Sequence, residues 1–386
     1  MPQESVPKWN LADPHSLKQA ESSPEGRLFV KILIASSIDP DAIKILSERH
    51  DVACAFNASE EVLKSLIVDR EVLILRSGVQ ITSSVMACAP NLKLLLRAGS
   101  GVDNIDLDYV RHHGIRMIRI PGPGARAVAE MTFALMLGVA RHVLEADRLL
   151  RHGRWAKREM TGYLLKGKVL GIIGAGNIGS RVGQLGAAWG MEVIGCIEHP
   201  SGSAATNLGA DGIRLVDYEQ VLMRADFLCL HVPLQASTRH LINAEALARM
   251  KRGAFLINLA RGGVVDEMAL YKALVEDHLR GAALDVHEHE GEGKMSPLAA
   301  LPNVILTPHI GANTFDSQHQ IGQIVIEMID GFVAELETGV TQTFVGRERL
   351  FREGKCGLSA AEYFRGRSET SEQNDTVQRA VSEIYK

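Results

Sequence analysis

The sequence predicts an α/β fold with doubly wound parallel β-sheets in more than one domain. Short apolar runs alternate with amphipathic helical segments from about residue 28 onward, and this alternation is typical of parallel sheets with helices on both faces. A strand, a glycine-rich turn and a helix follow one another in residues 168–189. The chain has 386 residues, of which 46% are hydrophobic, so it is long enough for about two domains.

The glycine-rich turn has the spacing that binds dinucleotides. An apolar run at 169–173 predicts a buried strand, and Gly174, Gly176 and Gly179 give the pattern G-x-G-x-x-G. The helix that follows has one apolar face, made by Ile178, Val182, Leu185 and Trp189. A tight turn without a ligand is the alternative, but the flanking strand and helix favour a dinucleotide site. We expect its phosphates on the backbone of the turn and the start of the helix, at Gly174, Ala175, Gly176, Asn177, Ile178 and Gly179.

The end of the next strand favours NAD over NADP. We expect that strand at 192–197, and Glu198 follows it about 20 residues after the last glycine, where an acid usually binds the ribose hydroxyls. No arginine or lysine comes after Glu198 until Arg214. A 2′-phosphate therefore has no evident cationic partner.

Two strand ends in the first part of the chain are candidate anion sites. The apolar pattern predicts strands at 29–35, 51–56, 71–76, 92–97 and 115–119, with helices between them at 41–49 and 60–68 among others. Ligands of open parallel sheets bind at the carboxyl ends of strands, and a basic side chain beside glycine N–H groups suits an anion. The candidates are Arg76, Ser77 and Gly78 after one strand and Gly99 and Ser100 after another, although each could be a plain turn.

Two long helices are expected to connect or cover the domains. Residues 121–124 (PGPG) predict a stiff break, and 125–151 reads as one long helix with an apolar middle. The arm at 152–166, with Trp155 among charged residues, could contact a second subunit or form a loop within its own domain. A further apolar helix pattern at 315–336 is expected to return to the first half of the chain.

Three later strand ends carry the candidate catalytic residues. The strands are expected at 255–259, 281–286 and 304–307. Arg261, Glu290 and His309 follow them in turn, and would meet at one edge of the sheet if the strands are parallel neighbours. Each residue alone could be a surface group. His287 and His289 beside Glu290 indicate a metal site only weakly, so no metal is expected.

Composition argues against several other classes of protein. The net charge of −4 gives no basic surface for nucleic acid. Five scattered cysteines suit a reducing cytoplasm rather than a disulfide framework. The purest apolar run, 133–140, is too short for a membrane span, and no signal peptide is evident. Residues 1–26 read as a polar arm and residues 346–386 as a tail.

Seven motifs in this order resemble the D-isomer-specific 2-hydroxyacid dehydrogenase family, especially its D-3-phosphoglycerate dehydrogenase branch. They are RAGSGVDNID (97–106), ARAVAEM (125–131), GIIGAGNIG (171–179), LHVPL (230–234), NLARGG (258–263), ALDV (283–286) and TPHIG (307–311). The resemblance covers about residues 30–345 and leaves the arm and the tail uncovered.

The resemblance implies roles for residues at matching positions. Arg261 would bind the substrate carboxylate, His309 would exchange the hydroxyl proton, and Glu290 would orient the imidazole. Further cofactor contacts are implied at Ser100, His231, Val232, Pro233, Leu259, Ala260, Asp285 and Gly311. Substrate contacts are implied at Arg76, Ser77, Gly78, Gly99, Ser100, Arg261 and His309.

The resemblance also implies two Rossmann-like domains. Residues 27–122 and 312–345 would form a discontinuous substrate-binding domain, and 123–311 the NAD-binding domain, which in this family often forms homodimers. The chain departs from the family pattern at three places. Cys196–Pro200 replaces Tyr-Asp-Pro, Gly291 replaces the proline after the catalytic glutamate, and His287 replaces a phenylalanine.

The expected function is NAD-dependent hydride transfer at C2 of a small D-2-hydroxy acid. The resemblance favours D-3-phosphoglycerate and 3-phosphohydroxypyruvate, hence serine biosynthesis, in a cytoplasmic homodimer without the regulatory domain of some relatives. A hydroxypyruvate or glyoxylate reductase is the alternative among enzymes. An NAD-sensing protein of the co-repressor type is the alternative from another class, although all three catalytic positions are filled.

Overall fold

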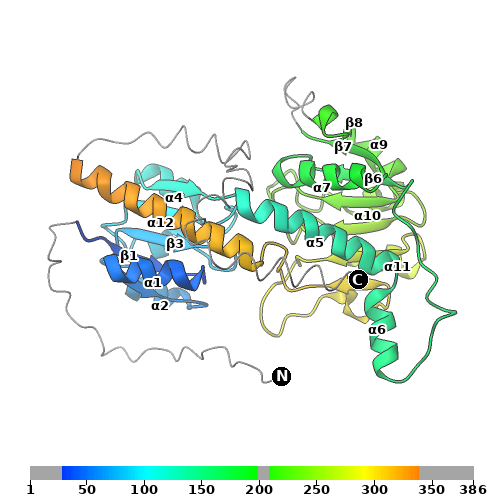
Figure 1. The fold of residues 1–386 in the computed structure, drawn as a ribbon, viewed down its shortest axis with the longest axis horizontal. Helices are drawn as coiled ribbons and strands as arrows, with labels where there is room; N and C mark the ends of the chain where they lie inside the picture. The colour runs from blue at the N-terminus through cyan, green and yellow to red at the C-terminus, as the bar shows by residue number, and fades with distance from the viewer. Residues whose placement is uncertain (1–27, 199–207, 339–386) are drawn as a thin grey trace, which may run out of the picture. The chain divides into compact units, whose positions relative to one another are not determined.

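The computed structural model describes residues 28–198 and 208–338, which form two compact units (Figure 1). Unit 1 contains the described residues up to Ala98, then Asn104–Ile118 and the chain from His319. Unit 2 contains Gly99–Asp103 and the described residues of Arg119–Gln318. The expected arm at 1–26 and tail at 346–386 lie outside the described residues. The roles assigned to 27–122 with 312–345 and to 123–311 stay predictions.

Unit 1 is a five-stranded parallel sheet in the order β2-β1-β3-β4-β5. Its strands lie where the apolar runs predict them, each slightly shorter: β1 (Lys31–Ile34), β2 (Asp51–Cys54), β3 (Val72–Leu75), β4 (Leu94–Arg97) and β5 (Arg116–Arg119). The connecting helices are α1 (Pro40–Arg49), α2 (Glu60–Leu66), α3 (Ser83–Met86) and α4 (Leu107–His112). Side-chain oxygens of Ser59, Thr82 and Asp106 each accept a hydrogen bond from an unpaired backbone N–H in the first turn of α2, α3 and α4. These caps fix where the helices begin.

Both faces of this sheet are covered. Leu33, Leu73 and Leu95 pack with residues of α2, α3 and α4 in one apolar core. The long helix α12 (Phe315–Thr338) belongs to unit 1 from His319 onward. A Cβ at Gly322 would lie 2.9 Å from the Cβ of Ala42 in α1, so this glycine allows the two helices to pack closely.

Unit 2 is a seven-stranded sheet in the order β12-β11-β10-β9-β6-β7-β8, and all its pairs are parallel. The strands are β6 (Val169–Ile173), β7 (Glu192–Cys196), β8 (Arg214–Leu215), β9 (Phe227–Leu230), β10 (Phe255–Asn258), β11 (Gly281–Leu284) and β12 (Val304–Leu306). The described helices are α5 (Gly122–Ala140), α6 (Val143–Arg151), α7 (Asn177–Ala188), α9 (Tyr218–Arg224), α10 (Ala244–Arg249), α11 (Glu267–Val275) and the 3₁₀ turn η1 (Pro297–Ala300).

Alternate strand residues of unit 2 enter two apolar cores. Ile172 and Ile257 pack on the side of α5 and α7, whereas Leu228 and Leu256 pack on the side of α9, α10 and α11. Both faces are therefore buried, which explains why these strands are apolar throughout rather than alternating. The fold class predicted from the sequence, α/β with two doubly wound parallel sheets, is confirmed.

The single helix expected at 125–151 is wrong. The structure has two helices, α5 and α6, bent by 61° at a short break. His142 at the break has φ +53°, a left-handed conformation that ends a helix, and the Tyr163 N–H caps the Ala140 carbonyl (2.9 Å). Neither glycine nor proline marks this position, so the sequence pattern runs through it.

The expected break at 121–124 is also misplaced, because α5 already begins at Gly122. Pro123 is tolerated there since the first turn of a helix leaves its N–H groups unbonded. Among the described residues no single helix is long and apolar enough to cross a membrane, although the bent pair of α5 and α6 could by length and composition alone.

Candidate active site

The glycine turn joins β6 to α7 and has room beside its second glycine. Gly174 has φ +93°, and a Cβ there would lie 2.7 Å from the His231 carbonyl oxygen. A Cβ at Gly179 would lie 2.3 Å from the Gly174 carbonyl oxygen. A Cβ at Gly176 would meet no described atom within 4 Å. An open backbone at the start of a twelve-residue helix fits the pyrophosphate of a dinucleotide.

The end of β7 presents the acid expected to bind the ribose. The Cys196 carbonyl accepts hydrogen bonds from the N–H groups of Gly174 (3.0 Å) and Ala175 (3.2 Å), which ties the glycine turn to this strand. Glu198 follows two residues later and is exposed. Its contact with ribose stays a prediction, and His199 and Pro200 lie outside the described residues.

His231, Val232 and Pro233 follow β9, the other neighbour of β6. The His231 carbonyl and the Val232 side chain border Gly174, so this segment forms one wall of the turn. Both ring nitrogens of His231 are buried without a hydrogen-bond partner among the described residues. Burial lowers the pKa of His231 to about 4, which leaves the ring uncharged at neutral pH.

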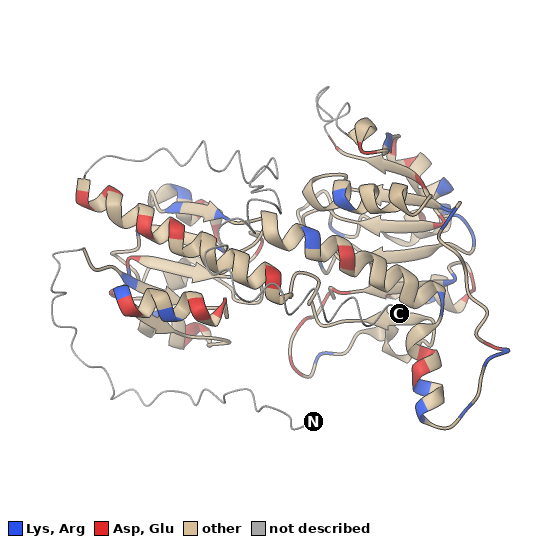
Figure 2. Ribbon diagram, viewed as in Figure 1, with Lys and Arg blue, Asp and Glu red and all other residues tan. Residues whose placement is uncertain are grey.

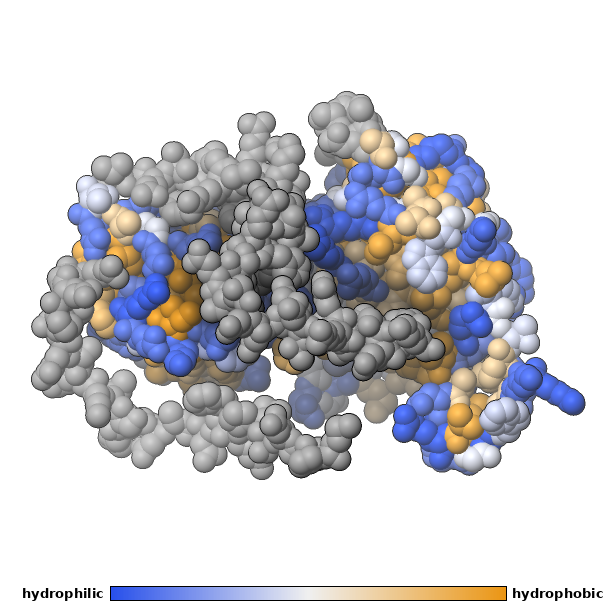
Figure 3. Space-filling model, in the orientation of Figure 1, coloured by the Kyte–Doolittle hydropathy of each residue, from blue (hydrophilic) through white to orange (hydrophobic). Residues whose placement is uncertain are grey.

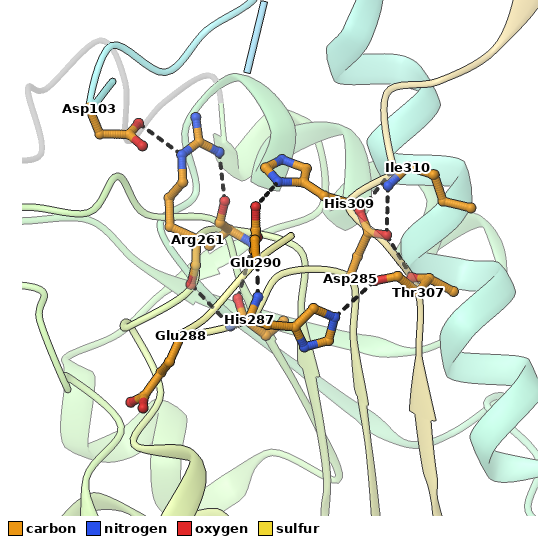
Figure 4. A network of polar contacts seen from close by, with 12 residues as sticks. Asp103, Arg261, Asp285, His287, Glu288, Glu290, Thr307, His309 and Ile310 are labelled. Carbon is orange, nitrogen blue, oxygen red and sulfur yellow. Dashed lines mark hydrogen bonds and ion pairs between the residues drawn. The ribbon is translucent and has the colours of Figure 1, made fainter. Parts of the chain in front are cut away.

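Arg261 follows β10 and is held by contacts on several sides (Figure 4). Its Nε donates to Asp103 Oδ1 (2.9 Å) and its Nη1 donates to the Ala260 carbonyl (2.7 Å). A Cβ at Gly101 would overlap Nη2 at 1.5 Å, so the guanidinium in this position packs directly on the glycine backbone. The buried Asn258 shapes the turn by accepting from the Ala260 N–H and donating to the Arg261 carbonyl. These contacts leave the second N–H of Nη1 and both N–H groups of Nη2 for an anionic ligand.

His309 and Glu290 form a hydrogen-bonded pair. His309 Nδ1 lies 3.0 Å from Glu290 Oε2, and the other carboxylate oxygen accepts the His287 N–H (3.2 Å). Because the carboxylate accepts, Nδ1 carries the proton and Nε2 is the nitrogen that can exchange one with a ligand. Burial alone would raise the pKa of Glu290, but the hydrogen bond and charge of His309, with the His287 N–H, lower it overall.

The buried carboxylate of Asp285 builds the turn that presents His309. It accepts hydrogen bonds from Thr307 Oγ1 (2.6 Å) and from the N–H groups of Ile310 (2.9 Å) and Gly311 (2.7 Å). His309 itself has φ +55° and donates its N–H to the Asp285 carbonyl (2.8 Å). A left-handed residue that is not glycine carries strain, and such strain often occurs at functional sites. Asp285 is thus a structural anchor here, and its nicotinamide contact stays a prediction.

The structure brings the three candidate catalytic residues to one sheet edge. β10, β11 and β12 are parallel neighbours, as the sequence analysis required, and Figure 4 shows Arg261, Glu290 and His309 grouped beyond their ends. Leu259 and Ala260 are buried beneath them. Asp103 and Gly101 were not foreseen as partners of Arg261, although both lie within the motif at 97–106.

The candidate substrate residues are divided between the units. Arg76, Ser77 and Gly78 follow β3 in unit 1, whereas Gly99 and Ser100 follow β4 and belong to unit 2. Burial lowers the pKa of the Arg76 guanidinium. None of the described residues hydrogen-bonds or ion-pairs with that side chain. A half-buried guanidinium without a counter-ion suits an anionic ligand.

The fold and this geometry define a class of protein: a dinucleotide-binding α/β protein with an arginine and a Glu–His pair at neighbouring strand ends. The model of the D-isomer specific 2-hydroxyacid dehydrogenase NAD-binding domain matches residues 133–311. The chain belongs to the D-isomer-specific 2-hydroxyacid dehydrogenase family and contains its NAD-binding domain.

Three similar proteins show the range of the family. A D-3-phosphoglycerate dehydrogenase of Methanocaldococcus jannaschii is 43% identical over 300 residues, 78% of this chain and 57% of that one. A hydroxypyruvate reductase of Thermotoga maritima is 37% identical over 309 residues, 79% of this chain and 98% of that one. The structure of an Aquifex aeolicus D-lactate dehydrogenase with NAD and lactic acid has a TM-score of 0.71 and 30% identity, over 80% of this chain and 97% of that one. The match thus spans little more than half of the first relative.

Proposed function

We propose that the protein is an NAD-dependent oxidoreductase that transfers a hydride between nicotinamide and C2 of a small D-2-hydroxy acid. One observation carries the proposal. Arg261 and the Glu290–His309 pair follow adjacent strands of the same sheet that carries the open glycine turn. An enzyme of this kind needs a carboxylate binder and a proton-exchanging group near a nicotinamide, and these residues supply both.

The side chains have distinct tasks in this proposal. The Arg261 fork binds the substrate carboxylate with two parallel hydrogen bonds, which lysine could not match in geometry. His309 Nε2 takes the hydroxyl proton in oxidation and returns it in reduction. Glu290 holds the imidazole in the tautomer that leaves Nε2 facing the ligand. Bound NAD accepts or supplies the hydride.

The residues around the glycine turn are proposed to hold the cofactor. The backbone of 174–179 would bind the pyrophosphate and Glu198 the ribose, with His231 to Pro233 as one wall. Ser100, Leu259, Ala260, Asp285 and Gly311 are proposed around the nicotinamide. A carboxylate at position 198 favours NAD because it would repel a 2′-phosphate.

D-3-phosphoglycerate and 3-phosphohydroxypyruvate are the proposed substrate pair, which implies serine biosynthesis. Support comes from the 43% identity to a D-3-phosphoglycerate dehydrogenase. It also comes from the Arg76 guanidinium, which has no counter-ion among the described residues and so suits a phosphate. Ser77 and Gly78 after it, and Gly99 with Ser100, are proposed as further substrate contacts. Hydroxypyruvate reduction is the second candidate, favoured by the match over 98% of the Thermotoga maritima enzyme.

A substrate panel tests the proposal. The purified protein is mixed with NADH or NADPH and with 3-phosphohydroxypyruvate, hydroxypyruvate, glyoxylate or pyruvate, and loss of absorbance at the NADH band is followed. We expect the highest kcat/KM with NADH and 3-phosphohydroxypyruvate. A preference for hydroxypyruvate would select the second candidate. NADH binding without turnover of any acid would contradict the enzyme and favour a cofactor-sensing protein.

A cytoplasmic homodimer is proposed for the assembly. The four cysteines in the described part of the chain are free, which suits a reducing compartment. The charges of α6 are paired along the helix, Glu145 with Arg148 and Asp147 with Arg151 (Figure 2). The space-filling view shows hydrophobic and hydrophilic residues side by side on the surface of this unit (Figure 3). Large hydrophobic side chains are exposed on α6 and on the arm that follows it, namely Val143, Leu144, Leu150, Trp155 and Leu164. Light scattering should give twice the chain mass, and Trp155→Glu should shift it toward the monomer.

A further inference from the structure

A buried acid lies behind the candidate catalytic pair. Glu267, the first residue of α11, is 3% exposed. Its Oε1 accepts a hydrogen bond from the Glu288 N–H (2.8 Å), and its Oε2 accepts one from Ser296 Oγ (2.5 Å). Desolvating a carboxylate is costly unless hydrogen bonds compensate it. The Glu267 side chain therefore binds two residues, Glu288 and Ser296, of a loop that begins 21 residues later in the sequence.

Those two points are the ends of the loop that carries Glu290. The loop runs from Glu288 to Ser296 and contains no regular secondary structure. It includes Gly291 at φ +125° and Gly293 at φ +72°, and glycines of this kind lose much conformational entropy when they become ordered. Glycine at 291 also removes the stiffness that proline would give directly after Glu290. A fixed position for Glu290 must then come from contacts outside the loop.

His287 lies beside the same acid and bonds to the segment that follows β12. Its Nε2 donates to the Thr307 carbonyl (3.0 Å), two residues before His309. Its Nδ1 lies 4.0 Å from Glu267 Oε1, too far for a hydrogen bond, so the ring packs beside the acid without bonding to it. The His287 N–H donates to Glu290. Hydrogen bonds therefore connect Glu267 with both ends of the loop that carries Glu290. The neighbouring His287 bonds to Glu290 and to the segment just before His309.

We propose that Glu267 is a positioning residue that clamps the loop at 288–296 so that Glu290 keeps its hydrogen bond to His309. It touches neither substrate nor cofactor in this role. The inference rests on the proposed function for its catalytic consequence, and on the hydrogen bonds of Glu267 for the clamp itself. It also accounts for a loop with two glycines in place of a proline-stiffened one.

The test compares three variants with one control. Glu267→Ala removes both contacts with the loop. Ser296→Ala removes the far contact, together with the hydrogen bond that Ser296 Oγ accepts from the Leu298 N–H. Glu267→Gln keeps the shape and can still accept from the Glu288 N–H. Met268→Ala alters the exposed neighbour on α11 and serves as the matched control. Each protein is examined by amide hydrogen exchange, by NADH fluorescence titration and by steady-state kinetics.

We expect faster exchange in peptides covering 288–296 for Glu267→Ala and Ser296→Ala, with exchange around 174–179 unchanged. Because misplacement of a catalytic group by about 1 Å can cost ~100-fold, kcat should fall roughly 10- to 100-fold in Glu267→Ala and roughly three- to tenfold in Ser296→Ala. NADH affinity should stay within about twofold, since the glycine turn is built by other strands. Glu267→Gln should recover most of the loss, and Met268→Ala should match the unmodified protein.

Unchanged exchange at 288–296 in Glu267→Ala would overturn the clamp, as would full kcat in both Glu267→Ala and Ser296→Ala. Equal losses of NADH affinity and kcat would also overturn it, because they would show general damage to the fold. If the unmodified protein turns over no 2-oxo acid, the proposed function fails. The exchange data and NADH titrations still decide whether Glu267 holds the loop.

Discussion

The strand ends of unit 2 form two regions of different chemistry. Around β6 and β9 the groups are uncharged: three glycines, backbone carbonyls and His231, whose ring is enclosed and neutral. Beyond β10, β11 and β12 they are charged and paired, Arg261 with Asp103 and His309 with Glu290. The strand ends at β6 and β9 therefore suit a ligand that lies close to the backbone. Those at β10, β11 and β12 suit the binding of an anion and the transfer of a proton.

The two histidines give the sharpest test of this division. His309→Ala removes the group that exchanges the proton, so kcat should fall by ~10²–10⁴ while NADH still binds. His231→Asn changes a ring that takes no part in proton transfer, so kcat should stay within about tenfold. Stopped-flow absorbance of NADH with a saturating 2-oxo acid measures both. Similar losses of kcat in the two variants would show that His309 is not set apart from His231 by a role in proton exchange.

The next largest effect is expected at Arg261. Arg261→Lys keeps the positive charge but loses the planar fork, so kcat/KM for the 2-oxo acid should fall roughly 10- to 100-fold, the range of one or two charged hydrogen bonds. NADH affinity should not change. Arg249→Lys is the control, because Arg249 forms exposed ion pairs with Glu219 and Glu245 away from these strand ends. If both variants keep full kcat/KM, Arg261 does not bind the carboxylate.

In unit 1, the Arg76 guanidinium at the end of β3 has no hydrogen-bond or ion-pair partner among the described residues. Arg76→Ala should lower kcat/KM roughly tenfold for 3-phosphohydroxypyruvate, because a charged hydrogen bond to phosphate is lost. Activity on hydroxypyruvate should change much less. Steady-state rates with the two acids, measured side by side, provide the test. Equal losses would remove the phosphate role and leave Arg76 as a general support of the site.

The smallest effect concerns stability rather than rate. The pKa of His231 falls from 6.5 to about 4 on folding, so the unfolded chain binds the proton first as the pH drops. The free energy of unfolding is therefore unaffected by this residue above pH 6.5. It declines as the pH falls from 6.5 toward 4, by up to about 1.4 kcal/mol per pH unit. Burial also lowers the pKa of His50, which acts in the same direction.

Urea unfolding at several values between pH 7.5 and 5 measures this decline. We expect a loss of about 1 to 2 kcal/mol in the unmodified protein over that range, since His231 is partly exposed as a whole. His231→Asn should show a flatter dependence. An identical slope in the two proteins would mean that the ring is not enclosed as the structure has it.

The sequence predicts what depends on local pattern. Apolar runs and glycine spacing locate the strands and the turn at Gly174, and the parallel order of β10, β11 and β12 follows from the alternation of strands and helices. The break at His142 escaped prediction because no helix-breaking residue marks it, and the N–H group that caps the end of α5 comes from the distant Tyr163.

Partnerships between distant residues were also out of reach of the sequence. Asp103 and Arg261 are 158 positions apart, and neither spacing nor composition relates them. Glu267 reads as an ordinary residue in the first turn of a helix, and only the structure shows that its carboxylate is buried under a loop. Strand ends can thus be located from pattern, but the side chains that fix catalytic groups in place cannot.

The fate of the hydride tests the proposed reaction most directly. The protein is supplied with 3-phosphohydroxypyruvate and with NADH that carries deuterium at both C4 positions, and the product is examined by mass spectrometry and chiral chromatography. We expect one deuterium at C2 of a product with the D configuration, and loss of this product in His309→Ala. A product without deuterium, or with the L configuration, would contradict the proposed reaction.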